Sequence, residues 1–125
     1  MGQFDQFKDV FRRLLTLTDV AGASATQVGS NPDSYGLTAG GYIYIGDVAC
    51  LTLTGYLSQS ATISVDQSAD GGENVYYTNN YTIATGVYTN GHSIEALCPW
   101  VRLRLQNGAM TQTAERIALC GRKVT

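Results

Sequence analysis

The stretch that decides the fold is Ala61–Gly72, which reads ATISVDQSADGG. Its apolar residues Ala61, Ile63 and Val65 alternate with polar residues, and the Asp-Gly-Gly sequence at its end is typical of a tight turn. A period of two places successive side chains on opposite faces of a strand. The stretch therefore predicts a strand with one buried face that ends in a turn.

The same pattern recurs on both sides of this stretch. Alternating or β-rich runs occupy residues 42–45, 49–54, 74–83, 92–98, 101–105 and 117–120, and turn signals such as Asn90-Gly91 and Asn107-Gly108 separate them. Short strands at intervals of about ten residues are typical of two packed antiparallel sheets. Residues 42–125 are therefore expected to form an antiparallel, jelly-roll-like β-sandwich domain.

The segment before Tyr42 has a different pattern. Phe4, Phe7, Phe11 and Leu14 recur at spacings of three and four, which predicts an amphipathic helix over about residues 3–15. Glycines punctuate residues 18–41 too often for a long element, so we expect an extended arm there. Residues 1–41 are thus predicted to be a separate helix and arm, which dock either on their own sandwich or on a neighbouring subunit.

Composition and charge exclude several classes of protein. Charged residues make up 14% of the chain, against the usual quarter or so, but eight tyrosines and a net charge of −2 indicate an ordered domain. The acidic balance argues against nucleic-acid binding. The sequence contains no apolar run of about 18 residues, so no membrane span is predicted. The charges at Asp5, Lys8 and Asp9 interrupt the apolar stretch that a signal peptide requires, and we expect synthesis in the cytosol.

The positive charge is concentrated at the two ends of the sequence. No Lys or Arg lies between Leu14 and Val101, whereas the last part of the chain is basic. Such an asymmetric distribution of charge can orient a protein against a partner. An equally good interpretation is that these are scattered surface charges with no role in binding. The later bases that we consider as contact residues are Arg102, Arg104, Arg122 and Lys123.

No group of residues in the sequence indicates catalysis or metal binding. His92 is the single histidine, and no nucleophile motif accompanies it, so we expect no catalytic residue and no enzyme activity. Asp66, Asp70 and Glu73 lie close together but lack the spacing of a calcium loop. We therefore expect neither a metal nor a cofactor.

The cysteines form an odd set of three without a CxxC spacing: Cys50, Cys98 and Cys120. This count disfavours a disulfide framework and favours thiols packed as small apolar side chains. Cys50 and Cys120 share the outward parity of their strands, so a bridge between them stays open if those strands are neighbours.

All eight tyrosines lie between Tyr35 and Tyr88, and half of them are in residues 76–88. Tyrosine is common in strands, is favoured in protein interfaces and stacks on sugars. The sequence leaves these three interpretations open.

Two motifs resemble those of small β-sandwich proteins in the virions of tailed bacteriophages. Residues 61–71 resemble the strand and Ser-x-Asp-Gly turn of these proteins. Trp100–Gly108, WVRLRLQNG, followed by Gln112-Thr113, resembles their later strand and turn. The resemblance covers about residues 46–120.

The resemblance implies a capsid decoration (cement) protein that bridges subunits of the major capsid protein, or binds another virion protein, as a homotrimer located in the virion. A tail, neck or fibre-adaptor protein and a carbohydrate-binding adsorption module are the alternatives with the same fold. The residues that we expect to contact the partner are Phe4, Phe7, Phe11 and Leu14 on the helix, with Arg102, Arg104, Arg122 and Lys123 as further candidates.

Overall fold

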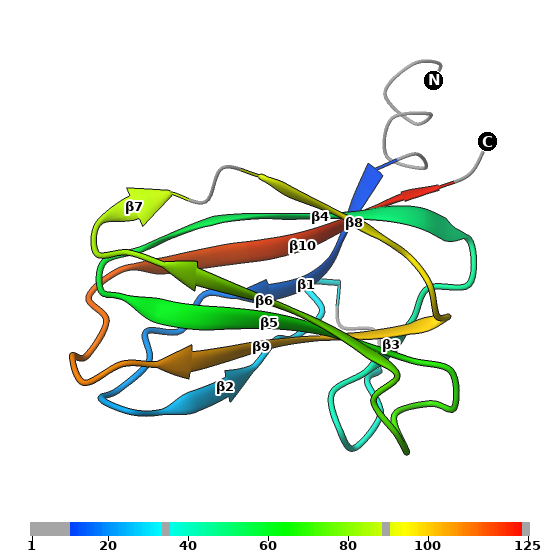
Figure 1. Cartoon of the computed structure of the whole chain (residues 1–125), viewed down its shortest axis with the longest axis horizontal. Helices are drawn as coiled ribbons and strands as arrows, with labels where there is room; N and C mark the ends of the chain where they lie inside the picture. The colour runs from blue at the N-terminus through cyan, green and yellow to red at the C-terminus, as the bar shows by residue number, and fades with distance from the viewer. Residues whose placement is uncertain (1–10, 34–35, 89–90, 124–125) are drawn as a thin grey trace.

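The computed structural model describes residues 11–33, 36–88 and 91–123, and within these ranges it contains ten β-strands and no helix (Figure 1). The strands are β1 (Phe11–Leu17), β2 (Thr26–Val28), β3 (Ile43–Tyr44), β4 (Val48–Leu57), β5 (Ala61–Ser68), β6 (Tyr77–Ile83), β7 (Val87–Tyr88), β8 (His92–Glu95), β9 (Trp100–Asn107) and β10 (Glu115–Lys123). The prediction of a mainly β fold is confirmed. None of the described residues forms a helix of the length and hydropathy needed to span a membrane.

The strands form two five-stranded sheets in which every pairing is antiparallel. Sheet A has the order β1-β10-β4, with β7 and β8 both paired to β4; sheet B has the order β2-β9-β5-β6, with β3 paired to β9. The chain crosses repeatedly between the two sheets. Sheet A contains β1, β4, β7, β8 and β10, and sheet B contains β2, β3, β5, β6 and β9. Repeated crossing between two sheets is typical of jelly-roll sandwiches.

One hydrophobic core joins the two sheets. Ile63 and Val65 on β5 are buried as predicted and lie opposite Leu105 and Leu103 on β9. The polar residues Ser64 and Asp66 between and beside them are buried as well, so β5 is covered on both faces and not on one face as predicted. Leu53 on β4 contributes to the same core from sheet A. Burial of such side chains stabilises the fold by about 2 kcal/mol each, which makes the period-two pattern the main determinant of the architecture.

The predicted N-terminal helix is wrong where the structure describes it. Residues 11–17 form β1, which pairs with β10 from Phe11 opposite Arg122 to Leu17 opposite Ile117. The register shifts between Arg13 and Leu15, so Leu14 occupies a β-bulge. The bulge lets Leu14, Leu15 and Leu17 all reach the core, and this spacing imitates the period of a helix. Residues 3–10 of the predicted helix lie outside the described residues.

The predicted arm is also part of the sandwich where it is described. Thr26–Val28 pairs with β9 as β2, and Ser30 forms a β-bridge with Thr16. The described part of residues 1–41 is thus hydrogen bonded to later strands, since β1 pairs with β10 and β2 pairs with β9.

The Ser-x-Asp-Gly motif organises the loop between β5 and β6. Ser68 donates from Oγ to Asp70 Oδ1 at 2.7 Å and accepts the amide of Gly72 at 2.9 Å. Asp70 also accepts the backbone amide and the side-chain amide of Asn74 at 3.0 and 2.9 Å. Gly72 has φ of +99°, and a Cβ there would lie 2.5 Å from the Tyr42 ring, so the turn requires glycine.

The second motif closes the opposite end of the sandwich. Gln112 is buried, donates to Asn107 Oδ1 at 2.9 Å and also bonds both backbone groups of Gln59. Asn107 in turn donates to the carbonyl oxygens of Gly22 and Met110 at 2.7 and 2.9 Å. These two amide side chains therefore join the turn after β9 to the loops after β1 and β4.

Candidate functional site

The end of the sandwich at which β1 begins and β10 ends gathers the features of a binding surface. The turn before β4, the loop after β5 and the loop after β8 lie at this end, on the right of Figure 1. The strand registers agree, since Phe11 lies opposite Arg122, Cys50 opposite Glu95, and Trp100 opposite both Ser68 and Tyr44. Polar and aromatic side chains from distant parts of the sequence therefore meet here.

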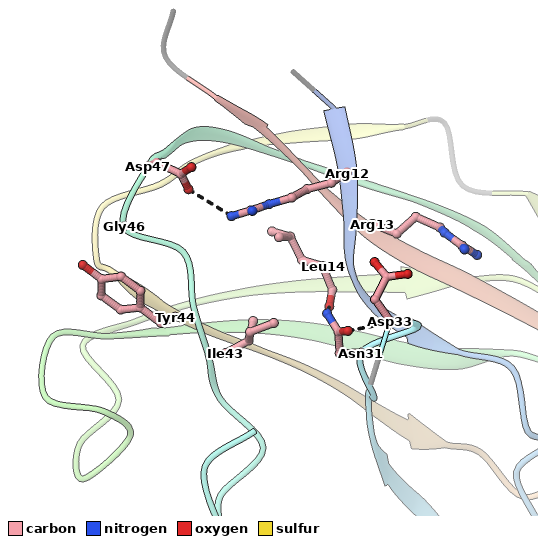
Figure 2. Close-up of a pocket in the computed structure, with 9 residues that line it drawn as sticks. All are labelled: Arg12, Arg13, Leu14, Asn31, Asp33, Ile43, Tyr44, Gly46 and Asp47. Carbon is pink, nitrogen blue, oxygen red and sulfur yellow. Dashed lines mark hydrogen bonds and ion pairs between the residues drawn. The ribbon is translucent and has the colours of Figure 1, made fainter. Parts of the chain in front are cut away.

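A groove of about 480 Å³ lies at this end (Figure 2). Figure 2 shows Arg12 reaching across it toward Asp47, and the Arg12 Nη2 atom lies 2.9 Å from Asp47 Oδ1. Both side chains are about half exposed, so water screens this ion pair and its contribution to stability is small. The lining residues are Arg12, Arg13, Leu14, Asn31, Asp33, Ile43, Tyr44, Gly46 and Asp47.

Asn31 fixes the inner wall of the groove. Its Nδ2 atom donates to the carbonyl oxygen of Leu14 at 2.9 Å, and its Oδ1 atom accepts the amide of Asp33 at 2.8 Å. The first bond satisfies a backbone group of the β-bulge, which the ladder with β10 leaves without a regular partner. Asn31 therefore holds the bulge that directs Leu14 inward.

Exposed aromatic side chains lie in the groove wall and in the loop after β5. Tyr44 is 60% exposed and its ring meets Trp100 edge to face, with 5.2 Å between the ring centroids. Tyr76 is 57% exposed, and its hydroxyl donates to Asp70 at 3.2 Å. Hydrogen bonds from Asn74 and Ser68 hold the pKa of Asp70 far below its usual value, so this loop keeps an ionised carboxylate at neutral pH. Large aromatic surface beside fixed polar groups is typical of interfaces and of sugar-binding surfaces.

The predicted tyrosine cluster is divided between two roles. Tyr81 is half-buried, packs against the core and stacks on His92 with 4.1 Å between the ring centroids. Tyr76 and Tyr77 are exposed, so they are more accessible to a ligand than Tyr81 is. Sequence reasoning missed the pair of Tyr44 and Trp100, because these residues are distant along the chain and meet only across the β3–β9 pairing.

Arg102 and Arg104 share one carboxylate. Asp66 on β5 is fully buried, and it accepts hydrogen bonds from Arg102 Nε at 2.9 Å and from Arg104 Nε and Nη2 at 2.5 and 2.9 Å. Burial alone would raise the pKa of Asp66, but bonds from Arg104, Thr78 and Arg102 outweigh it and lower the pKa. The guanidinium of Arg102 also lies 4.6 Å from the centroid of the Tyr42 ring. These two arginines therefore link β9 to β5.

The other predicted contact residues are distributed differently. Leu14 is 2% exposed and belongs to the core, so its side chain does not offer a contact surface. Phe11 begins β1 opposite Arg122, which is exposed, and Lys123 lies opposite Val48 at the end of β10. Phe4 and Phe7 lie outside the described residues, so their role stays a prediction.

The described residues form no cluster of three or more His, Cys, Asp or Glu side chains that could hold a metal ion. Asp66 and Asp70, two of the three acids weighed for calcium, are bound to arginines and to their own loop. Cys50 and Cys120 lie on the neighbouring strands β4 and β10 but opposite Arg122 and Thr52, and all three cysteines are free thiols in the described part of the chain. Burial raises the pKa of the Cys120 thiol, which makes it a poor nucleophile.

Comparison with known proteins supports the fold. The structure is similar to the crystal structure of the PBSX exported protein XepA, with a TM-score of 0.64 and 16% identity. The match covers 93% of this chain and 38% of XepA, so the chain spans well under half of that protein. A subunit from disulfide-linked pili, the Bacillus endospore appendages, matches with a TM-score of 0.49 and 13% identity over 93% of this chain and 88% of the other. No family model and no curated protein matches the sequence.

Proposed function

We propose that this chain is a structural protein of a bacteriophage particle, and within that class a non-enzymatic capsid decoration protein. Its partner is the major capsid protein or another virion protein, and its assembly form is a homotrimer. The protein is then located in the virion after synthesis in the host cell.

The observation that carries the proposal is the structural role of the two motifs that resemble those of virion proteins. Short motifs can match by chance, but Ser68 and Asp70 fix the loop after β5, and Asn107 and Gln112 lock the opposite end. The motif positions are thus the ones on which the construction of this sandwich depends. The resemblance therefore concerns how the fold is built, and jelly-roll sandwiches are common in viral capsid proteins.

The exposed end supplies a means of attachment. In the sequence, the first ten residues precede β1, which begins beside the groove, and they contain Phe4 and Phe7. Three copies of a short apolar segment would bind a shell with higher avidity than one copy, without a strong single contact.

A truncation tests this attachment. Deletion of residues 1–20 would remove β1 together with the core residues Leu15 and Leu17, so it would also disturb the fold. Deletion of residues 1–10 leaves β1 and both of these core residues in place. We expect the shorter deletion to retain the thermal unfolding midpoint and to lose co-sedimentation with particles that lack the protein. Binding equal to that of the full chain would overturn this part of the proposal.

Labelling of particles tests the location. Immunogold electron microscopy with an antibody against the sandwich is expected to label the whole shell. Label at one vertex would assign the protein to the tail or neck, and absence of label from purified particles would refute a virion role.

A second candidate function is a carbohydrate-binding adsorption module, which the exposed rings of Tyr44 and Tyr76 and the neighbouring Trp100 favour. It predicts binding on a glycan array that Tyr44→Ala or Tyr76→Ala removes. Tyr81→Ala is not an informative variant, because this ring supports the core. An array without signal would exclude this candidate.

A further inference from the structure

The free edge of β6 differs from the other sheet edges in the described part of the chain. β6 lies last in the order of sheet B, so it pairs with β5 on one side and with no described strand on the other (Figure 1). A free edge presents unpaired backbone N–H and C=O groups, and soluble proteins normally protect it with charges, proline, a bulge or a short strand. The edges of this sandwich can be compared by these devices.

The other edge strands of the two sheets carry such protection. β1 is interrupted by the bulge at Leu14 and carries positive charge at Arg12 and Arg13. β2, β3 and β7 have three, two and two residues, and β8 has four residues and ends in Glu95. Each of these described edges is therefore short, bulged or charged.

β6 carries none of these devices. It has seven residues, Tyr77–Ile83, with the sequence YTNNYTI, which contains no charge and no proline. Its register with β5 runs without a shift along all of these residues, so it has no bulge. Thr78, Asn80 and Thr82, which alternate along the strand, are exposed. A long, regular and uncharged edge is the kind that pairs with another strand.

We propose that β6 pairs antiparallel with β6 of a second copy of this chain, so that the two copies share one continuous sheet. Strand addition at a free edge derives its affinity from main-chain hydrogen bonds. A two-fold pairing uses the same surface of both copies and is therefore self-complementary. This inference goes beyond the proposed function and does not depend on it; in a homotrimer the pairing would connect two trimers.

The sequence of β6 suits a second copy. The register that pairs the whole strand is centred on Asn80, which then lies opposite Asn80 of the second copy, with Thr78 opposite Thr82 in both halves. Thr–Thr pairs stabilise a sheet, whereas like charges directly opposite one another destabilise it. Because residues 74–94 contain no Asp, Glu, Lys or Arg, no charge of one β6 faces its like in the other.

Disulfide trapping in the purified full chain tests both the pairing and its register. Asn80→Cys places two thiols at the two-fold axis, where opposite residues have Cα atoms about 5 Å apart, within the range that a disulfide spans. Thr82→Cys is the matched control, because it is equally classed as exposed on the same strand. In the proposed register two copies of residue 82 lie four positions apart, about 14 Å, which is too far for a disulfide.

The rate of disulfide formation is the measurement. With copper phenanthroline as the oxidant, we expect Asn80→Cys to form the linked dimer about tenfold faster than Thr82→Cys, because strand pairing raises the local concentration of its thiol. Mass spectrometry locates the disulfide. The unsubstituted chain gives the background from its own free thiols, Cys50, Cys98 and Cys120.

A charge at the axis tests the association without a cross-link. Asn80→Lys places two lysines opposite each other, whereas Thr62→Lys adds the same charge to β5, which has a strand on each side. We expect Asn80→Lys to raise the concentration at which larger assemblies form in sedimentation velocity by about fivefold or more, and Thr62→Lys to leave it within about twofold. Circular dichroism melting verifies that both variants are folded.

The outcomes decide the proposal. A disulfide that joins residue 80 of two copies, together with a larger shift for Asn80→Lys than for Thr62→Lys, supports it. Equal rates for the two cysteine variants, no linked dimer above the background, or equal shifts for the two lysine variants overturn it. These measurements use the chain without particles, so their failure leaves the virion role intact, and absence of label from particles leaves the strand pairing intact.

Discussion

The outer faces of the two sheets both carry arginines, but the surroundings of these arginines differ. On sheet B, Arg102 and Arg104 converge on the buried carboxylate of Asp66. On sheet A, Arg13 and Arg116 surround small side chains, and Glu95 at the edge is the one acid among the described residues of that face.

The comparison shows that the position of one acid decides what an arginine does. Asp66 lies 36 residues before Arg102 and 38 before Arg104, and the β5–β9 pairing brings them together. No acid faces the middle of sheet A in the described part of the chain. The arginines of sheet B therefore bind a carboxylate of their own sheet, whereas Arg13 and Arg116 lie on an outer face of sheet A whose one described acid, Glu95, is at the edge.

Removal of the shared carboxylate should have the largest effect. Asp66→Asn leaves two guanidinium groups against a neutral amide in a site where the carboxylate is fully buried. We expect a loss of about 3 kcal/mol in the free energy of unfolding, measured by urea denaturation, since an ion pair broken on one side leaves uncompensated charge. A loss below about 1 kcal/mol would mean that the cluster is not a determinant of stability.

Removal of one arginine from that cluster should cost less. Arg104→Gln eliminates two charge-assisted hydrogen bonds to Asp66, while Arg102 still neutralises the carboxylate. A decrease of about 2 kcal/mol in the free energy of unfolding is expected by the same assay. Arg104→Lys is the control that retains charge without the paired geometry, and it should recover part of the loss.

Glu115 offers a buried carboxyl without an arginine. Its Oε1 atom accepts the amide of Ala21 at 3.1 Å, and its Oε2 atom has no hydrogen-bond partner among the described residues. Burial raises the pKa of Glu115 above its ordinary 4.5, so the folded state binds the proton more tightly than the unfolded state does.

The two buried carboxyls therefore predict opposite pH dependences. The contribution of Glu115 is complete below pH 4.5 and is lost as the pH rises from there through the raised pKa, at a rate of about 1.4 kcal/mol per pH unit between those two values. The contribution of Asp66 is present above pH 3.8 and is lost as the pH falls below it toward the lowered pKa. Urea midpoints measured between about pH 3 and pH 8 should show that Glu115→Gln removes the loss on the alkaline side alone, and an unchanged profile would contradict the assignment.

The smallest effect on stability is expected for the arginines on the outer face of sheet A. Arg13→Gln with Arg116→Gln should change the free energy of unfolding by no more than about 0.5 kcal/mol, because neither arginine faces a buried carboxylate among the described residues. A loss comparable to that of Arg104→Gln, measured by the same urea denaturation, would remove the contrast between the two sheets.

Much of the sandwich could be predicted because its determinants are local in sequence. The alternation around Ile63 and the turn at Asp70 describe one strand and its end, and the structure contains both. The N-terminal helix could not be distinguished from β1, since a bulge at Leu14 produces a helical spacing of buried residues in a strand. Of the expected contact residues, Leu14 is in the core, and Arg102 and Arg104 bind Asp66 while their side chains stay partly exposed, so a contact role for these two arginines stays a prediction.

The strand period, the turn chemistry and the absence of a local catalytic motif followed from the sequence alone, because each of these depends on neighbours along the chain. Tertiary structure decided which arginines bind Asp66 and that Tyr44 meets Trp100. It also decided that residues 11–17 belong to sheet A. These features depend on strand pairing between distant segments, and pairing sets which charges and rings face one another.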